Sequence, residues 1–143
     1  MVKEALRLHA SAGVGRSVVK DVTVKNGKGQ AYTIPAGCYV YNFSIVGSHY
    51  DELYPPKAAE FRPERFLDEE TAADNLKNWY PFSYGPRNCV GQPLAQAELK
   101  TILVHVLHRY NLRVNAKQTV DPIPVLTLTV KPHQVLLDVE RRH

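Results

Sequence analysis

One segment of this sequence has residues suited to chemistry: a cysteine flanked by glycines and preceded by an arginine. The segment reads Phe82-Ser-Tyr-Gly85-Pro-Arg87-Asn-Cys89-Val-Gly91. The two glycines permit tight backbone turns around the cysteine. Arg87 adds positive charge and can bind a carboxylate with two hydrogen bonds. A predicted helix follows, whose free N–H groups and dipole stabilise a thiolate. With Phe82 as an apolar wall, the segment predicts a buried thiolate beside an anion site.

The two cysteines and a pair of histidines also have plainer interpretations. Without its flanking pattern, Cys89 would be read as an ordinary buried cysteine. We expect Cys38 to be a core residue of a strand, and a disulfide between the two cysteines stays open because pairing depends on distances. A reduced, intracellular environment is the expectation. His105 and His108 lie on one helical face with no third ligand in evidence, so we expect a solvated stripe and not a metal pair.

The bulk properties of the chain describe one ordered domain. Its 143 residues allow a single domain with a core. Hydrophobic residues at 44% and charged residues at 22% are typical of globular proteins. The net charge of +4 comes from scattered basic residues, which argues against nucleic-acid binding. No apolar run reaches membrane-spanning length, and the N-terminus lacks the pattern of a signal peptide.

Hydrophobic periodicity predicts the elements that must position the cysteine segment. Helices are predicted over residues 2–9 and 93–110, and residues 68–81 carry a weak helical signal on the surface. Strands are predicted over residues 17–25, 31–34 and 38–45, with residues 126–130 and 135–139 as a closing pair. The second helix is apolar around most of its circumference, so we expect it to be buried on most sides.

Little of this chain is available to bury that helix, and the sequence begins inside a predicted helix with no cap residue. We therefore expect that Met1 is an internal methionine of a longer chain, or a start codon placed too late.

The cysteine segment resembles the cysteine-ligand loop of the cytochrome P450 superfamily, the haem-thiolate monooxygenases. The family pattern Phe-x-x-Gly-x-Arg-x-Cys-x-Gly is matched by Phe82, Gly85, Arg87, Cys89 and Gly91. The resemblance implies that Cys89 is the proximal thiolate ligand of the iron of haem b (iron protoporphyrin IX), and that Arg87 pairs with a haem propionate. Thiolate ligation pushes electron density onto the iron and favours O–O bond cleavage.

Three further matches occur in the family's order. Glu4-Ala-Leu-Arg7 resembles the Glu-x-x-Arg motif of the family's penultimate long helix, although a spacing of three places any such pair on one helix face. Residues 61–66, Phe-Arg-Pro-Glu-Arg-Phe, resemble the family's Pro-Glu-Arg-Phe motif. The resemblance implies that Arg65 locks onto the Glu4/Arg7 pair and that this network braces the cysteine loop. Arg16 matches the position of a second propionate-binding arginine.

The resemblance covers nearly the whole chain and implies its fold. Residues 1–143 would be the C-terminal haem-binding portion of a single cytochrome P450 domain, mainly α with short β-sheets (α+β) and incomplete. One departure is Ala10-Ser11-Ala12, which follows Leu-Arg-Leu-His where relatives often have proline. The oxygen-binding helix with its acid–threonine pair, a haem-holding tryptophan and arginine, and the substrate-recognition loops have no counterpart in these residues.

The function implied by the resemblance belongs to a longer parent protein. We expect the parent to insert one oxygen atom of O2 into a small organic substrate, using electrons from a redox partner of the reductase or ferredoxin type. Lys100 is a candidate member of a basic surface for an acidic donor. This portion holds no catalytic residue of its own and is expected to be inactive alone. We expect an intracellular location, at the endoplasmic reticulum membrane if the parent is a eukaryotic microsomal form.

Two other classes of function stay open at the level of sequence. The chain could be a non-catalytic truncated product, or a small haem-binding or interaction module. It could also be a redox-sensing cysteine domain without haem. In-frame sequence upstream of Met1 that encodes an acid–threonine helix would favour the monooxygenase.

Overall fold

The computed structural model describes residues 1–115, 118, 122–124, 128–130 and 135–142. Its helices are α1 (Val2–Leu8), α2 (Ser44–Gly47), α3 (Ala72–Lys77) and α4 (Gln92–Arg109), with short 3-10 helices η1 (Pro63–Phe66) and η2 (Gly85–Arg87). Its strands are β1 (Val14–Ser17), β2 (Val22–Lys25), β3 (Ala31–Ile34), β4 (Tyr39–Asn42), β5 (Tyr110–Val114), β6 (Pro122–Pro124), β7 (Leu128–Val130) and β8 (Leu137–Arg141).

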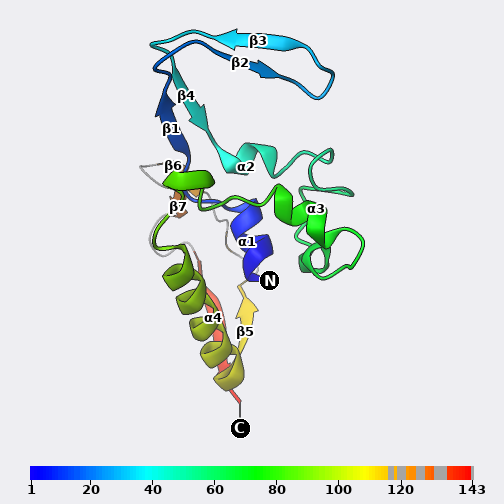
Figure 1. Ribbon diagram of the computed structural model, residues 1–143. Helices are drawn as coiled ribbons and strands as arrows, with labels where there is room; N and C mark the ends of the chain where they lie inside the picture. The colour runs from blue at the N-terminus through cyan, green and yellow to red at the C-terminus, as the bar shows by residue number, and fades with distance from the viewer. Residues whose placement is uncertain (116–117, 119–121, 125–127, 131–134, 143) are drawn as a thin grey trace.

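The strands of the described residues form four separate antiparallel pairs, β1–β4, β2–β3, β5–β8 and β6–β7. The hairpin of β2 and β3 projects at one end of the molecule, and α4 with β5 leads away from α1 at the other (Figure 1). The expected α+β architecture of helices with short sheets is confirmed. The helices predicted over residues 2–9 and 93–110 are also confirmed, as α1 and α4.

The strand predicted over residues 17–25 is wrong in its bounds, because the chain turns between β1 and β2. These two strands pair with different partners, β4 and β3. The carboxylate of Asp21 accepts a hydrogen bond from the backbone N–H of Ala36 at 2.8 Å, and the N–H of Val18 donates to the carbonyl of Cys38 at 2.9 Å. Local valine content could not reveal this change of partner, since both halves favour strands.

Strands are found at the C-terminus where the closing pair was predicted, but they do not pair with each other. Strand β8 pairs with β5, and β7 pairs with β6. In the β5–β8 ladder, Val139 lies opposite Leu112 and Leu137 lies opposite Val114. Apolar cross-strand pairs of this kind stabilise a particular register. Part of the predicted strand, residues 126 and 127, lies outside the described residues.

The sheet of β1 and β4 also corrects two expectations. Strand β4 ends at Asn42, and the helix α2 takes up residues that were predicted as strand. Cys38 is exposed and lies just before β4, so its expected place in the core is wrong. The physical reason is that the described residues do not bury this two-stranded sheet, and every residue of β4 is exposed.

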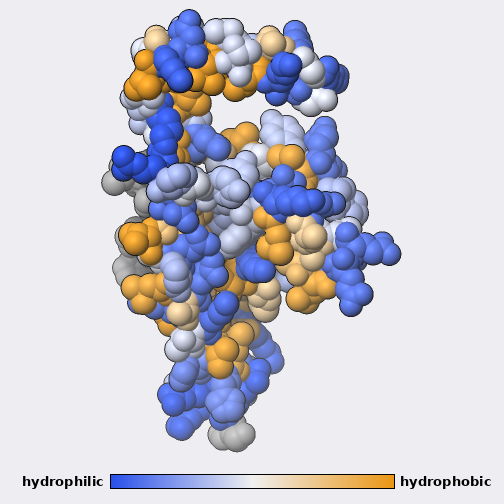
Figure 2. Space-filling view, in the orientation of Figure 1, coloured by the Kyte–Doolittle hydropathy of each residue, from blue (hydrophilic) through white to orange (hydrophobic). Residues whose placement is uncertain are grey.

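Helix α4 contains no buried residue among the parts of the chain that the structure describes. Leu94, Ile102 and Val104 are each at least 60% exposed, and hydrophobic residues reach the surface in the part of the molecule where α4 lies (Figure 2). The expected burial of this helix is therefore not supplied by the described residues. None of the described helices is long and apolar enough to cross a membrane.

The buried centre lies around α1 and the segment of residues 48–66. Its apolar members among the described residues are Leu8, Ala10, Tyr54 and Ala58. Its polar and charged members are Glu4, Arg7, Ser48, Arg65 and Asn75. Because buried charges are costly unless they are paired and hydrogen-bonded, this centre depends on the polar contacts of those side chains.

Candidate functional site

Glu4 and Arg7 form a two-point ion pair on α1. They lie one turn apart, so their side chains share a face of the helix. Nε of Arg7 donates to Oε2 of Glu4 at 2.8 Å, and Nη2 donates to Oε1 at 2.8 Å. Glu4 is 0% exposed and Arg7 is 2% exposed. Two parallel hydrogen bonds fix both the distance and the orientation of the two groups.

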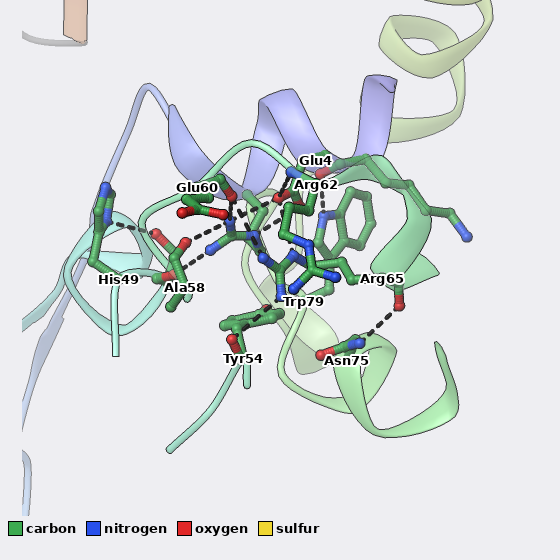
Figure 3. A network of polar contacts seen from close by, with 12 residues as sticks. Glu4, His49, Tyr54, Ala58, Glu60, Arg62, Arg65, Asn75 and Trp79 are labelled. Carbon is green, nitrogen blue, oxygen red and sulfur yellow. Dashed lines mark hydrogen bonds and ion pairs between the residues drawn. The ribbon is translucent and has the colours of Figure 1, made fainter. Parts of the chain in front are cut away.

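Arg65 joins the same carboxylate from η1, as Figure 3 shows. Its Nε donates to Oε1 of Glu4 at 3.0 Å, and the backbone N–H of Arg62 donates to the same oxygen at 2.9 Å. Proline at position 63 suits the start of η1 because its missing N–H would have no helical partner there. The structure thus brings together Glu4, Arg7 and Arg65, which are as far as 61 residues apart in sequence.

Backbone carbonyls of residues 48–60 surround the two guanidinium groups. Arg7 donates to the carbonyls of Ser48, Ala58 (2.7 Å) and Glu60 (3.3 Å). Arg65 donates to those of Tyr54 (3.2 Å), Lys57 (3.3 Å) and Glu60 (3.4 Å). Two cations share one carboxylate, so the partial negative charges of these carbonyls offset the excess positive charge.

Sequence reasoning missed this carbonyl cradle, because every residue type has a carbonyl. One conformational feature belongs to it: Lys57 has a φ of 59°, a left-handed conformation that is rare for residues with side chains. Among the described residues, every buried side-chain nitrogen and oxygen atom has a hydrogen-bond partner. The network is therefore fully satisfied.

Tyr54 closes the network from one side. The guanidinium carbon of Arg7 lies 4.8 Å from the centre of the Tyr54 ring, a distance typical of a cation–π contact. Burial of the ring raises the pKa of Tyr54 to about 12, against the opposing effect of the Arg7 charge. The phenol therefore stays neutral throughout the physiological range. No pattern in the sequence had singled out Tyr54.

The pKa of Glu4 lies below its ordinary value of 4.5. Burial alone would raise this pKa, and it is the largest single effect. Hydrogen bonds from Arg7, from the backbone N–H of Arg62 and from Arg65 outweigh it together with the charge of Arg7. The carboxylate is thus held in its ionised form by its donors.

The cysteine loop is shaped by two residues with left-handed backbone and by one cross-loop hydrogen bond. Gly85 has a φ of 78° and Ser83 a φ of 69°, and glycine adopts this region at little cost. The N–H of Cys89 donates to the carbonyl of Phe82 at 2.9 Å, which closes the loop. Helix α4 begins at Gln92, so Cys89 lies just before a helix N-terminus as the sequence predicted.

The expected burial of Cys89 is not found in the described residues, where the cysteine is free and exposed. The loop lies at the surface of this portion, and Phe82 is only half-buried. The turn role expected of Gly91 is also not required, because its φ of −80° is open to any residue. A Cβ atom at Gly91 would meet Cys89 Sγ at 3.8 Å, so glycine here leaves free space beside the sulfur.

The two predicted anion-binding arginines are exposed and have no acidic partner among the described residues. Nη1 of Arg16 donates only to the carbonyl of its neighbour Gly15, at 2.8 Å. Arg16 lines a pocket of about 430 Å³ together with Tyr80, Ser83 and Tyr84. The same three residues line a second pocket of about 400 Å³ beside Gly85. Arg16 and the cysteine loop therefore border adjoining pockets.

One of the two histidines of α4 has a backbone partner. Nδ1 of His105 is hydrogen-bonded to the carbonyl of Thr101 at 2.9 Å. In the part of the chain that the structure describes, no three His, Cys, Asp or Glu side chains gather closely enough to hold a metal ion. The donor set around Cys89 is a single sulfur, which differs from the four-ligand set of a structural zinc site.

Replacing Glu4 with glutamine should destabilise the chain strongly. The amide keeps the size of the side chain but leaves two buried guanidinium groups without a counter-charge, which costs about 3–5 kcal/mol. The matched control is Asp74→Asn, which removes the exposed Lys77–Asp74 pair of 2.6 Å and should cost under about 0.5 kcal/mol. Urea unfolding followed by circular dichroism measures both, and equal effects of the two variants would contradict the buried network.

Lowering the pH should reduce the free energy of unfolding of the unsubstituted chain, because the carboxylate of Glu4 becomes protonated. The pKa of Glu4 is lower in the folded state than in the unfolded state, so the unfolded chain binds the proton first and stability rises with pH in that range. The contribution is present above about pH 4.5 and is lost as the pH falls below it through the folded pKa. Unfolding free energies measured across this range should fall less steeply in Glu4→Gln; parallel pH profiles would argue against a lowered pKa.

Comparison with known proteins gives a consistent assignment. The family model described as "Cytochrome P450" matches residues 1–137. The chain is 38% identical over 141 residues to cytochrome P450 9e2 of Blattella germanica, and this match covers 96% of this chain and 25% of that protein. It is 33% identical over 131 residues to the taurochenodeoxycholic 6 alpha-hydroxylase of Sus scrofa, with 91% of this chain and 24% of that protein covered.

A solved structure shows the same arrangement of elements. The crystal structure of the cytochrome P450 CYP102L1 matches with a TM-score of 0.79 at 28% identity, over 99% of this chain and 30% of that one. The chain thus spans about a quarter of the length of the curated relatives it matches. With the cysteine loop and the Glu4–Arg7–Arg65 network in place, the chain belongs to the cytochrome P450 family.

Proposed function

We propose that this chain is the haem-binding portion of a monooxygenase and that Cys89 supplies the thiolate ligand of the haem iron. The observation that carries the proposal is the free, exposed sulfur of Cys89, presented by a closed loop directly before the N-terminus of α4. Cys89 lies just before α4, whose N-terminus carries the partial positive charge of its free N–H groups. Residues 1–143 would then form the C-terminal part of a single cytochrome P450 domain.

The chemistry of the side chains near the loop fits haem b. One sulfur donor with two arginines, Arg87 and Arg16, matches an iron that needs one thiolate and a porphyrin that carries two carboxylates. Neither arginine has an acidic partner within the described residues, so both are free to bind propionates. When bound, the haem supplies the activation of O2, and the thiolate ligand favours O–O cleavage.

The remaining residues of the site hold the sulfur in place. Gly85 provides the left-handed turn of the loop, and the carbonyl of Phe82 holds the backbone of Cys89. Gly91 leaves space beside the sulfur. The Glu4–Arg7–Arg65 network fixes α1, the segment of residues 48–60 and η1 relative to one another. We assign these three residues a structural role, since their charged groups are satisfied by one another and by carbonyls.

The complete protein is proposed to insert one oxygen atom of O2 into a small organic substrate. A relative of this chain carries the name of a hydroxylase, which supports this class of reaction. The electrons would come from a reductase or ferredoxin, with exposed Lys100 on α4 as a member of the docking surface. The location proposed for the protein is intracellular, at the endoplasmic reticulum membrane for a microsomal form.

The isolated 143-residue chain should show no monooxygenase turnover. Its pockets beside Arg16 and the cysteine loop are open to solvent, so they do not exclude water from a reacting group. The measurement is product formation with haem, a reductase and NADPH, with a complete cytochrome P450 as the positive control. Turnover above the rate of free haem would contradict this prediction and favour an autonomous small enzyme.

Cys89→Ala in the full-length polypeptide that carries this segment should abolish the strongly red-shifted Soret band of the ferrous carbonyl complex. This band requires a thiolate on the iron. Cys38→Ala is the matched control, because Cys38 is also free and exposed, and it should leave the band unchanged. Retention of the band in Cys89→Ala would overturn the proposal. Absence of any haem spectrum in the unsubstituted polypeptide would favour a cysteine domain without haem.

A further inference from the structure

We propose that Trp79 is a positioning residue that couples the Glu4–Arg7–Arg65 network to the cysteine loop. The inference rests on the proposed function, in which the loop presents Cys89 to haem. Trp79 is the single tryptophan of the sequence and lies between the end of α3 and the start of the loop. The network residues themselves make no hydrogen bond to residues 82–91 within the described part of the chain, whereas Trp79 contacts both α1 and the loop.

The first contact of Trp79 is with α1. Its indole Nε1–H donates to the backbone carbonyl of Lys3 at 2.9 Å, across 76 residues of sequence. Lys3 directly precedes Glu4, the carboxylate at the centre of the network. Figure 3 shows the indole ring beside that network. A shift of α1 relative to the loop would therefore break this hydrogen bond.

The second contact of Trp79 is with the loop. Its ring meets the ring of Phe82 edge to face, with 6.3 Å between the centroids and an interplanar angle of 65°. This is a favourable geometry for an aromatic pair. The carbonyl of Phe82 accepts the hydrogen bond from the N–H of Cys89 at 2.9 Å. Trp79 thus holds the residue that holds the backbone of the cysteine.

Two asparagines, one in α3 and one directly before Trp79, hold the backbone of this segment in place. Nδ2 of Asn75 donates to the carbonyl of Arg65 at 2.7 Å, and Nδ2 of Asn78 donates to the carbonyl of Leu53 at 3.1 Å. Asn75 is buried. These bonds fix the backbone beside Trp79 to Arg65 of the network and to Leu53 in the segment of residues 48–60, but neither asparagine makes a hydrogen bond to Phe82. Trp79 contacts both α1 and Phe82. Because Trp79 is only half-buried, filling the core is not its main role.

The role is separable by two substitutions in the full-length polypeptide. Trp79→Phe keeps an aromatic ring against Phe82 but removes the N–H donor, and Trp79→Leu removes both contacts. Tyr32→Phe is the control, because it removes an aromatic side chain's hydrogen bond to Gln30 (2.7 Å) in the exposed β2–β3 hairpin. One readout is hydrogen–deuterium exchange of the Cys89 amide. A second is the rate at which the red-shifted carbonyl band is lost in mild urea, below the unfolding transition.

We expect Trp79→Phe to raise the exchange rate of the Cys89 amide and the rate of band loss by about fivefold, the effect of one lost hydrogen bond. Trp79→Leu should have a larger effect, and Tyr32→Phe should have none. The far-ultraviolet circular dichroism and haem content of Trp79→Phe should stay at wild-type values, which separates positioning from folding.

Wild-type exchange and band-loss rates in Trp79→Phe would overturn the role of Trp79 and leave the haem assignment intact. An equal rise in Tyr32→Phe would overturn it as well, because the effect would then be a general loss of stability. A polypeptide with no red-shifted band before any substitution would overturn the proposed function itself.

Discussion

The carboxylate of Glu4, shared by two buried guanidinium groups, is the interaction on which the rest of this structure depends. An isolated charge in such a place would be strongly unfavourable. Here Oε1 accepts hydrogen bonds from Arg7, Arg65 and the backbone of Arg62, while Oε2 accepts from Arg7. The network joins α1, η1 and the segment of residues 48–60. With few buried apolar residues among those described, it is the principal link between these elements.

This arrangement explains why the segment of residues 48–60 has a defined shape without forming a long helix or a strand. Its carbonyls turn inward toward Arg7 and Arg65, which satisfies the outer nitrogens of both guanidinium groups. The left-handed backbone of Lys57 belongs to the same turn. Strain of this kind persists where the surrounding structure holds it. A buried ion pair often adds little net stability, but two-point hydrogen bonding fixes the geometry of the groups that it joins.

The chain exposes several features that are usually covered in a folded protein. Cys89 is exposed, the apolar residues of α4 are exposed, and the pockets beside Arg16 and Gly85 are open. Large exposed apolar faces mark surfaces that bind something else. The chain spans about a quarter of the length of its curated relatives. In the proposed function, the described residues supply the thiolate ligand and the elements that support it.

The sequence determined the family, the position of the cysteine loop and the two main helices. Those features are local: a fixed spacing of Phe82, Gly85, Arg87, Cys89 and Gly91, and a sustained helical period after them. It also placed Glu4 and Arg7 on one helical face, because a spacing of three does so in any helix. The pairing with Arg65 came from a resemblance, since 58 residues separate it from Arg7 and no local rule joins them.

Only the tertiary structure decided the partners of the strands, the carbonyl cradle and the contacts of Trp79. Strand β8 pairs with β5, and β1 and β2 pair with different strands, because cross-strand packing depends on which segments meet in space. The exposure of Cys38 and Cys89 likewise depends on whether a second layer covers their loops. Local sequence fixes what a residue can do, but burial and partners are set by distant chain, and these decide what it does.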